Sequence, residues 1–270
     1  MGGGLTAVEQ GVTRAVTQCL ETGLIVREDG LLRPTQVGRV FASAGVPMAP
    51  STRLAGLLES AGRVRPSRQD LLFEVAWGDE TGERPWPRRE RGHELDPRPD
   101  LVPDGAGCSS DSRLAATLAK PRLTSLEARA LLKTRCLMEW ISGASLRGIS
   151  RQFSGHGAAP SRVQELGKNA AWLLGALASA AEVRDLNADL AAEINDLAIE
   201  ARYGLPAPLA PLARLHVPGI SRDALLTMLA EALVRCGEGS MHADDNGDLL
   251  ATARGVLRDE DLKSSSQAIS

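Results

Sequence analysis

Apolar residues recur every three or four positions along most of the chain, and this is the spacing of one face of an α-helix. The first stretch of this kind contains Leu5, Val8, Val12, Val16 and Leu20. Gly23 follows it, and glycine is the commonest residue just beyond the end of a helix. The pattern therefore predicts a helix over residues 5–22.

The next segment has a different pattern. In LIVREDGLLRP, two β-prone runs flank Asp29-Gly30, a residue pair typical of a two-residue hairpin turn. We expect a small β-wing over residues 24–32, followed by a helix with Thr35 as its N-cap. A helix, a hairpin and a helix form the outline of part of a winged helix, and they form many other small α+β units equally well.

Beyond the hairpin the helical spacing returns, with serine or threonine at the expected helix starts. We expect Ser51 to cap a helix over residues 51–60. Thr124 or Ser125 should open a second helix, and Ser161 should cap the long run SRVQELGKNAAWLLGALASAAEV. The fold class that these patterns predict is mostly α.

Two segments are harder to assign. Residues 71–77, LLFEVAW, are almost all apolar, and so short a run fits a helix or a strand. From residue 78 the periodicity stops, and Gly, Pro, Asp and Arg accumulate, so we expect a flexible linker or a surface loop. The tail after Asp259 is polar and rich in serine, and we expect it to be disordered.

The composition is that of an ordinary globular protein, with 43% hydrophobic and 24% charged residues. Aromatic residues make up only 3%, so the core must consist mainly of Leu, Ala and Val, which favours helices over sheets. The four cysteines are far apart, no signal sequence is visible, and no apolar stretch reaches the roughly 20 residues of a membrane span. We expect a cytoplasmic protein that has no membrane partner.

Common catalytic patterns are absent from the sequence. There is no glycine-rich phosphate loop, no HExxH and no G-x-S-x-G. MHADDNGD, residues 241–248, lacks the glutamate of a calcium loop, and Cys136 lies on an apolar stripe where a core thiol is expected. We therefore assign no catalytic residue and no metal site, and we expect no cofactor.

Four segments, in order, resemble the C-terminal accessory region of Ski-like superfamily 2 helicases, closest to the archaeal Hel-type DNA helicases. LETGLIVREDGLLRPTQVGRVFA is similar to the end of the family's winged helix. ALLKTRCLMEWISG resembles its K-T-x-x-L-L-x-x-W-I helix, and VQELGKNAAWLLGALASAAEV resembles its long ratchet helix with A-x-W-L. EARYGLPAPLAPLARLHVPGISRDALLTML resembles the junction from the ratchet domain to a helix-hairpin-helix.

The resemblance implies six regions along the chain. They are a partial winged-helix-like domain (1–50), the first helices of the helical domain (51–77), a flexible linker or surface loop (78–122), a ratchet-like helical domain (123–212), a helix-hairpin-helix-like region (213–258) and a disordered tail (259–270). The motor domains that precede this region in the family are absent from the sequence.

The resemblance also implies nucleic-acid-binding residues on the ratchet-like helix. The family's ratchet tryptophan stacks on a base of the single strand, and Trp172 matches it. Glu165 stands where the family has a basic residue, so we expect Lys168 and Arg162 to contact phosphates in its place. The structural alternative is that Trp172 belongs to the core.

A second set of binding residues is implied at the Pro-Gly turn of RLHVPGISRDALLTMLAEAL. There Gly219, Ser221 and Arg222 would meet a phosphate through backbone N–H groups and a guanidinium group. The family has glycine where this chain has Ser221, and the serine side chain would hinder the close approach of a phosphate. A packing hairpin without a ligand is the alternative.

The leading hypothesis is that the chain is a nucleic-acid-binding accessory module derived from a superfamily 2 DNA helicase. It lacks the ATPase motor and is expected to bind single-stranded DNA in preference to RNA. A separately encoded motor is an expected partner, and ATP-dependent helicase activity is expected only when that motor is joined. A helical protein-interaction scaffold is the first alternative, and the net charge of −3 favours it. A truncated fragment of a larger helicase is the second, since the sequence begins within the winged-helix resemblance.

Overall fold

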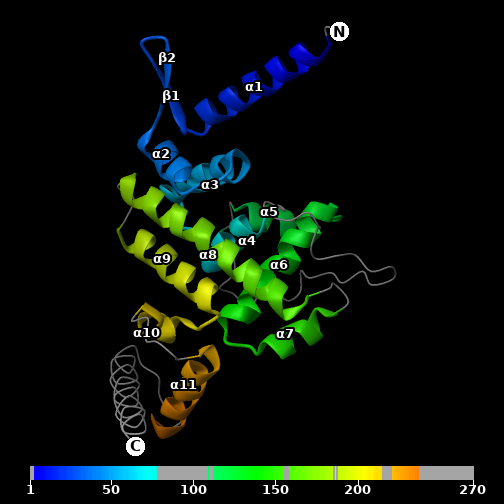
Figure 1. The fold of residues 1–270 in the computed structure, drawn as a ribbon, viewed down its shortest axis with the longest axis vertical. Helices are drawn as coiled ribbons and strands as arrows, with labels where there is room; N and C mark the ends of the chain where they lie inside the picture. Colours follow the sequence, from blue (N-terminus) through cyan, green and yellow to red (C-terminus); the bar gives the residue numbers. More distant parts are fainter. Residues whose placement is uncertain are drawn as a thin grey trace, which may run out of the picture.

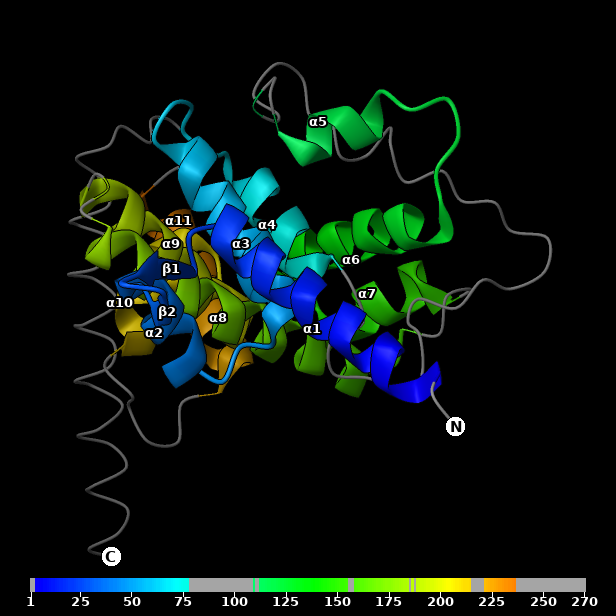
Figure 2. The same ribbon diagram turned by 90° about the horizontal axis from the view of Figure 1, so that it is seen from above.

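A computed structural model of the chain describes residues 3–77, 109, 112–154, 158–184, 186, 188–214 and 221–236 (Figure 1, and from above in Figure 2). This part of the chain is mostly helical and contains one two-stranded sheet, so the predicted fold class is confirmed at that level. The predicted tail and most of the predicted linker lie outside the described residues. No described helix has both the length and the apolar character needed to cross a membrane.

The N-terminal part follows the predicted order of helix, hairpin and helix. Helix α1 (Gly3–Glu21) leads into strands β1 (Ile25–Glu28) and β2 (Leu31–Pro34), which pair antiparallel. Asp29 and Gly30 have φ angles of 51° and 77°, because a type I′ turn requires the left-handed region at both positions. Helix α2 (Gln36–Ser43) then begins at its predicted N-cap, Thr35, whose hydroxyl oxygen accepts a hydrogen bond from the Gly38 N–H at 3.0 Å.

The remaining elements in the described part of the chain are helices. They are α3 (Met48–Ala61), α4 (Arg68–Ala76), α5 (Arg113–Leu118), α6 (Ser125–Ile141), α7 (Leu146–Gln152), α8 (Pro160–Val183), α9 (Ala188–Tyr203), the 3-10 turn η3 (Ala207–Leu209), α10 (Ala210–Arg214) and α11 (Arg222–Cys236). The ambiguous run 71–77 is helical up to Ala76, because Ser67 and Asp70 form a capping box that starts α4. Thr124 caps α6 in the same way, as predicted.

Two predicted helix starts are wrong. Helix α3 begins at Met48, and Ser51 lies within it, where its hydroxyl donates to the Pro47 carbonyl at 2.8 Å. Helix α8 begins at Pro160 with Ala159 as its N-cap, not Ser161. In both cases a nearby proline sets the start, because its fixed φ angle suits the first turn of a helix.

Helix α5 corrects the predicted linker over residues 78–122. Ser112 is its N-cap, and the Ser112 hydroxyl accepts a hydrogen bond from the Ala115 N–H at 3.0 Å. Leu114 is buried in a small cluster with Phe73 of α4 and Leu131 of α6. This burial gives so short a helix the tertiary support that it lacks by itself.

One continuous core joins the hairpin region to the helical body. The main cluster of buried side chains runs from Leu24 and Phe41 through α3, α4, α6 and α7 to α8 and α9, and it ends at Ala201. Helices α8 and α9 lie side by side, and α2 packs on the other side of α8 (Figure 1). The regions predicted as separate partial winged-helix and ratchet-like domains therefore share a core.

The indole of Trp140 is inserted between α6, α8 and α9. Its Nε1–H donates to the Ala201 carbonyl at 2.8 Å. A Cβ atom at Gly204, where φ is +65°, would lie 2.2 Å from the Trp140 ring, and a Cβ atom at Gly167 would lie 2.5 Å from the Ala201 oxygen. Both glycines are thus needed for the close approach of the indole.

Arg222, the first residue of α11, completes this arrangement, which we call the Trp140 joint. Its guanidinium carbon lies 4.3 Å from the centroid of the Trp140 ring. Its N–H groups donate to the Gly204 carbonyl at 2.8 Å and to the Ala144 carbonyl at 2.8 Å. Arg222 therefore binds carbonyl groups just beyond the C-terminal ends of α6 and α9, where a positive charge is favourable.

Candidate nucleic-acid interface

None of the residues predicted to bind a strand on α8 is fully buried. Lys168 is exposed and stands one turn before Trp172, so the two side chains are neighbours on the helix surface. Arg162 lies further toward the N-terminus and forms an ion pair with Glu165 at 3.2 Å. The structure thus brings Lys168 and Trp172 together and leaves the Arg162 charge partly neutralised.

A groove of about 770 Å³ lies between α2 and α8 and includes Trp172. It is lined from the α2 side by Gln36, Arg39, Val40, Ser43 and Ala44, and from the α8 side by Ala171, Trp172, Gly175, Ala176, Ser179 and Val183. Most of these side chains are small or apolar, so the groove has room for a planar group beside the indole.

The indole of Trp172 is fixed in place. Its Nε1–H donates to the Ala44 carbonyl at 2.8 Å, and its ring packs against the main core while remaining half-buried. The two alternatives for this residue, stacking and packing, are therefore compatible, because one edge of the ring is bound and part of it stays accessible. A ring held in this way loses little conformational freedom when a base stacks on it.

Arg39 is a candidate binding residue that the sequence patterns did not reveal. It is exposed on α2 and lines the groove that contains Trp172. Its Nη1 donates only a long hydrogen bond, 3.4 Å, to the Pro34 carbonyl. Its proximity to Trp172 depends on the packing of α2 on α8, and no local motif signals that packing.

The predicted phosphate contact at the Pro-Gly turn has a competing structural explanation. Gly219 lies outside the described residues. Ser221 acts as a helix cap, since its hydroxyl oxygen accepts a hydrogen bond from the Ala224 N–H at 3.1 Å. The guanidinium group of Arg222 is engaged in the Trp140 joint, and burial lowers its pKa, although a nearby Asp223 opposes this effect. The start of α11 at Arg222 thus places the guanidinium group of this residue over the Trp140 ring.

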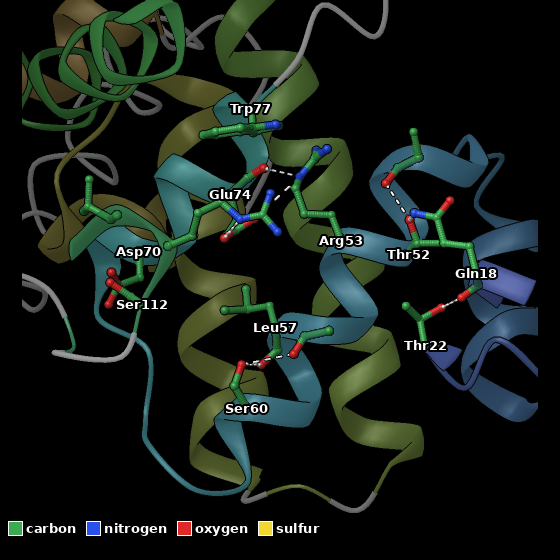
Figure 3. Close-up of a pocket in the computed structure, with 14 residues that line it drawn as sticks. Gln18, Thr22, Thr52, Arg53, Leu57, Ser60, Asp70, Glu74, Trp77 and Ser112 are labelled. Atoms are coloured by element: carbon green, nitrogen blue, oxygen red, sulfur yellow. Dashed lines mark hydrogen bonds and ion pairs between the residues drawn. The ribbon is translucent and has the colours of Figure 1, made fainter. Parts of the chain in front are cut away.

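A second hollow, which we call the α3 hollow, is polar (Figure 3). It has a volume of about 580 Å³ and lies over one face of α3, between the end of α1 and helices α4 and α5. Its lining includes Arg53, Glu74, Trp77, Ser112 and Arg113. None of these residues was selected from the sequence, since they come from three helices and form no motif.

The described residues offer little for nucleophilic or metal chemistry. Burial, with a smaller contribution from Glu139, raises the pKa of Cys136 to about 12, and the thiol is fully enclosed in the main core. The Cys136 thiol therefore stays protonated at neutral pH and acts as a small apolar group. Among the residues that the structure places, no cluster of His, Cys, Asp or Glu has the geometry of a metal site.

Comparison with protein families and with curated proteins adds no relative. No protein-family model matches the chain, and no curated protein matches it. The helicase resemblance therefore depends on the four quoted segments and on their order. The last three of these segments meet in space at the Trp140 joint, which contains Trp140 from the second segment, Gly167 from the third, and Gly204 and Arg222 from the fourth.

Proposed function

We propose that the groove between α2 and α8 binds single-stranded nucleic acid, DNA in preference to RNA, with a base stacked on Trp172. The observation that carries this proposal is the fixed and half-buried indole, bound at its N–H to Ala44, in the wall of a 770 Å³ groove. Stacking on an aromatic ring contributes roughly 1–3 kcal/mol per base and does not depend on base sequence.

The charge around the groove supports the same proposal. Arg39 is exposed and lines the groove from α2, and Lys168 is exposed on α8 one turn before Trp172, just outside the lining. Phosphate groups on either side of a stacked base would meet these two cations, and each contact would release counterions from the strand. The net charge of −3 belongs to the whole chain, so it does not prevent these two cations from forming a local positive site beside the groove.

On this proposal the chain is an accessory module related to the C-terminal part of superfamily 2 helicases. Its hairpin region corresponds to part of a winged helix, α8 to the ratchet helix, and α10 and α11 to a helix-hairpin-helix. A separately encoded motor would supply ATP hydrolysis. Three of the four resembling segments contribute residues to the Trp140 joint. This supports a fold shared with the family, because segments that resemble it only by chance would not be expected to contact the same side chain.

The binding test uses fluorescence anisotropy of a labelled thymidine oligomer at several salt concentrations, with a uridine oligomer for comparison. Trp172→Ala should weaken binding by about 1–3 kcal/mol, equally for different base sequences. Trp172→Phe should retain most of the affinity, because the ring remains and only the bond to Ala44 is lost. Lys168→Ala should lower the salt slope by roughly one unit.

Arg147→Ala on α7 is the matched control, since Arg147 is exposed and does not line the groove. It should leave affinity and salt slope unchanged. Melting must be measured on the same samples, because truncation of a packed tryptophan costs about 3–5 kcal/mol of stability. Early melting of Trp172→Ala, together with no strand affinity of the wild type at low salt, would reject the proposal.

A second candidate function, a helical protein-interaction scaffold, is favoured by α1. Val8 and Val12 are 65% and 58% exposed on this helix, although both belong to its apolar stripe. A helix with an uncovered apolar stripe is the usual feature of a surface that pairs with another helix. Sedimentation of the wild type and of the double variant V8E/V12E tests this idea. Association that the double variant abolishes would support the scaffold, and monomers in both cases would reject self-pairing.

A further inference from the structure

The α3 hollow contains two arginines that share one carboxylate (Figure 3). Arg53 of α3 approaches Glu74 Oε2 at 3.5 Å and donates to the Glu74 backbone carbonyl at 3.1 Å. Arg113 of α5 approaches Glu74 Oε1 at 3.3 Å. A single carboxylate thus faces guanidinium groups from two different helices.

The two carboxylates that line the hollow, Asp70 and Glu74, are buried. Asp70 Oδ2 accepts hydrogen bonds from the Ser67 backbone N–H, the Ser67 hydroxyl and the Ser109 N–H, at 2.8 to 3.0 Å. The two carboxylate oxygens without a hydrogen bond, Asp70 Oδ1 and Glu74 Oε2, are fully enclosed. Burial raises the pKa of Glu74 in spite of both arginines, so its negative charge is costly to maintain.

The accessible groups, in contrast, are hydrogen-bond donors. The Arg113 side chain is 42% exposed, and its guanidinium carbon lies 5.1 Å from the Trp77 ring centroid. Among the described residues only Glu74 pairs with Arg113, so its Nη groups remain available. Ser112 also lines the hollow, and its oxygen accepts from Ala115, which leaves its hydroxyl proton free to donate.

We propose that the α3 hollow binds a small oxyanion, a phosphate or carboxylate group, with Arg113 as its main contact and the Ser112 hydroxyl as a further donor. A planar guanidinium fork matches two oxygens of such a group. The volume of about 580 Å³ is in the range of small-molecule sites. The bound anion competes with Glu74 for Arg113. This site is separate from the α2–α8 groove and does not depend on the proposed strand binding.

Calorimetric titration of the full chain with inorganic phosphate, at constant ionic strength, tests the proposal. Phosphate should bind saturably, and Arg113→Gln should weaken it by at least roughly tenfold, because a hydrogen bond to a charged group is lost. Glu74→Gln should strengthen binding, because it removes the competing charge. If Glu74→Gln does not fold, Arg113→Gln still tests the anion site. Arg113 is half-exposed, so its replacement should leave the protein folded.

Arg147→Gln is the matched control and should bind phosphate as the wild type does. Acetate and citrate, titrated in the same way, distinguish a carboxylate site from a phosphate site. Trp172→Ala should retain phosphate binding, and Arg113→Gln should retain strand binding, so the two proposals can fail separately. The absence of saturable binding by any of these anions, equal binding by Arg113→Gln, or preferential binding of ethylammonium would overturn the oxyanion site.

Discussion

The Trp140 ring restricts positions 204 and 167 to glycine. The ring of Trp140 occupies the space that a Cβ atom at Gly204 or Gly167 would need. The indole also has its N–H bonded to Ala201 and its face covered by Arg222. A buried aromatic side chain with its polar atom satisfied is a strong anchor for a helical protein.

Gly204→Ala should destabilise the protein by about 2–4 kcal/mol. An alanine there must adopt the left-handed conformation, at a cost of about 1–2 kcal/mol, and its methyl group must displace the Trp140 ring. Urea denaturation followed by tryptophan fluorescence measures the loss. Gly11→Ala is the control, because no atom lies near that position and alanine favours a helix by up to about 1 kcal/mol. Equal stability of the two variants would contradict the role of Gly204.

At the scale of elements, ion pairs connect helices that are distant in sequence. Arg68 at the start of α4 binds both carboxylate oxygens of Glu200 on α9, and the Glu200 side chain is almost fully buried. Burial raises the pKa of Glu200, although the hydrogen bond and charge of Arg68 lower it. The pair positions α4 against α9 at a cost in desolvation.

This pKa shift has a definite consequence for stability. A carboxyl group whose pKa is raised by folding contributes most below its unfolded pKa, near 4.5, and the contribution is lost as pH rises through the folded pKa. Glu200→Gln should therefore remove part of the fall in stability just above pH 4.5. Arg68→Gln should steepen that fall, because it leaves the buried carboxylate without its cation. Unfolding free energies measured across this pH range would show whether the two variants diverge as expected.

Helix α1 differs from the other helices because little of the fold covers it. In Figure 1 it extends from the hairpin, and its main contact is with β1. Its link to the body includes a hydrogen bond from Gln18 to Thr52.

Val12→Ser should thus change the unfolding free energy by less than about 0.5 kcal/mol, as is usual for exposed sites. The same change at Val163 of α8, which is 1% exposed, should cost about 2–4 kcal/mol, because a buried methyl pair is lost and a hydroxyl is enclosed. Thermal unfolding of the two variants side by side gives the comparison. A large loss at Val12 would mean that α1 is covered by part of the chain.

The elements themselves were largely predictable from the sequence, because caps and turns are local. Thr35, Thr124 and Asp29-Gly30 act as predicted, since each needs only neighbours within four residues. The groove was only partly predictable. Trp172 was identified from a motif, but its acceptor, Ala44, lies 128 residues away in sequence. The α3 hollow was not predictable at all, because its arginines come together only when α3, α4 and α5 pack.

For the whole molecule, the shared core implies cooperative unfolding. Phe41 next to the hairpin and Leu197 on α9 belong to the same buried cluster. A cluster that joins both regions leaves neither of them an independent core.

We expect one unfolding transition, with the same midpoint by tryptophan fluorescence and by far-UV dichroism. Phe41→Ala should shift both signals together and cost about 3–5 kcal/mol. Leu32→Ala on the hairpin, where the leucine is 45% exposed, is the control and should leave the midpoint almost unchanged. Two separate transitions, with only the first responding to Phe41→Ala, would show that the hairpin region unfolds alone.

The Trp140 joint also sets an order of events during synthesis. The indole finds its carbonyl partner 61 residues later in the chain, and the arginine that covers it comes 82 residues later. At about 5–20 residues per second, a ribosome needs roughly ten seconds to produce that interval. Until α9 and α11 have been synthesised, the Trp140 indole lacks these two partners. The Trp140 joint can thus be completed only after α11, the last described helix, has emerged.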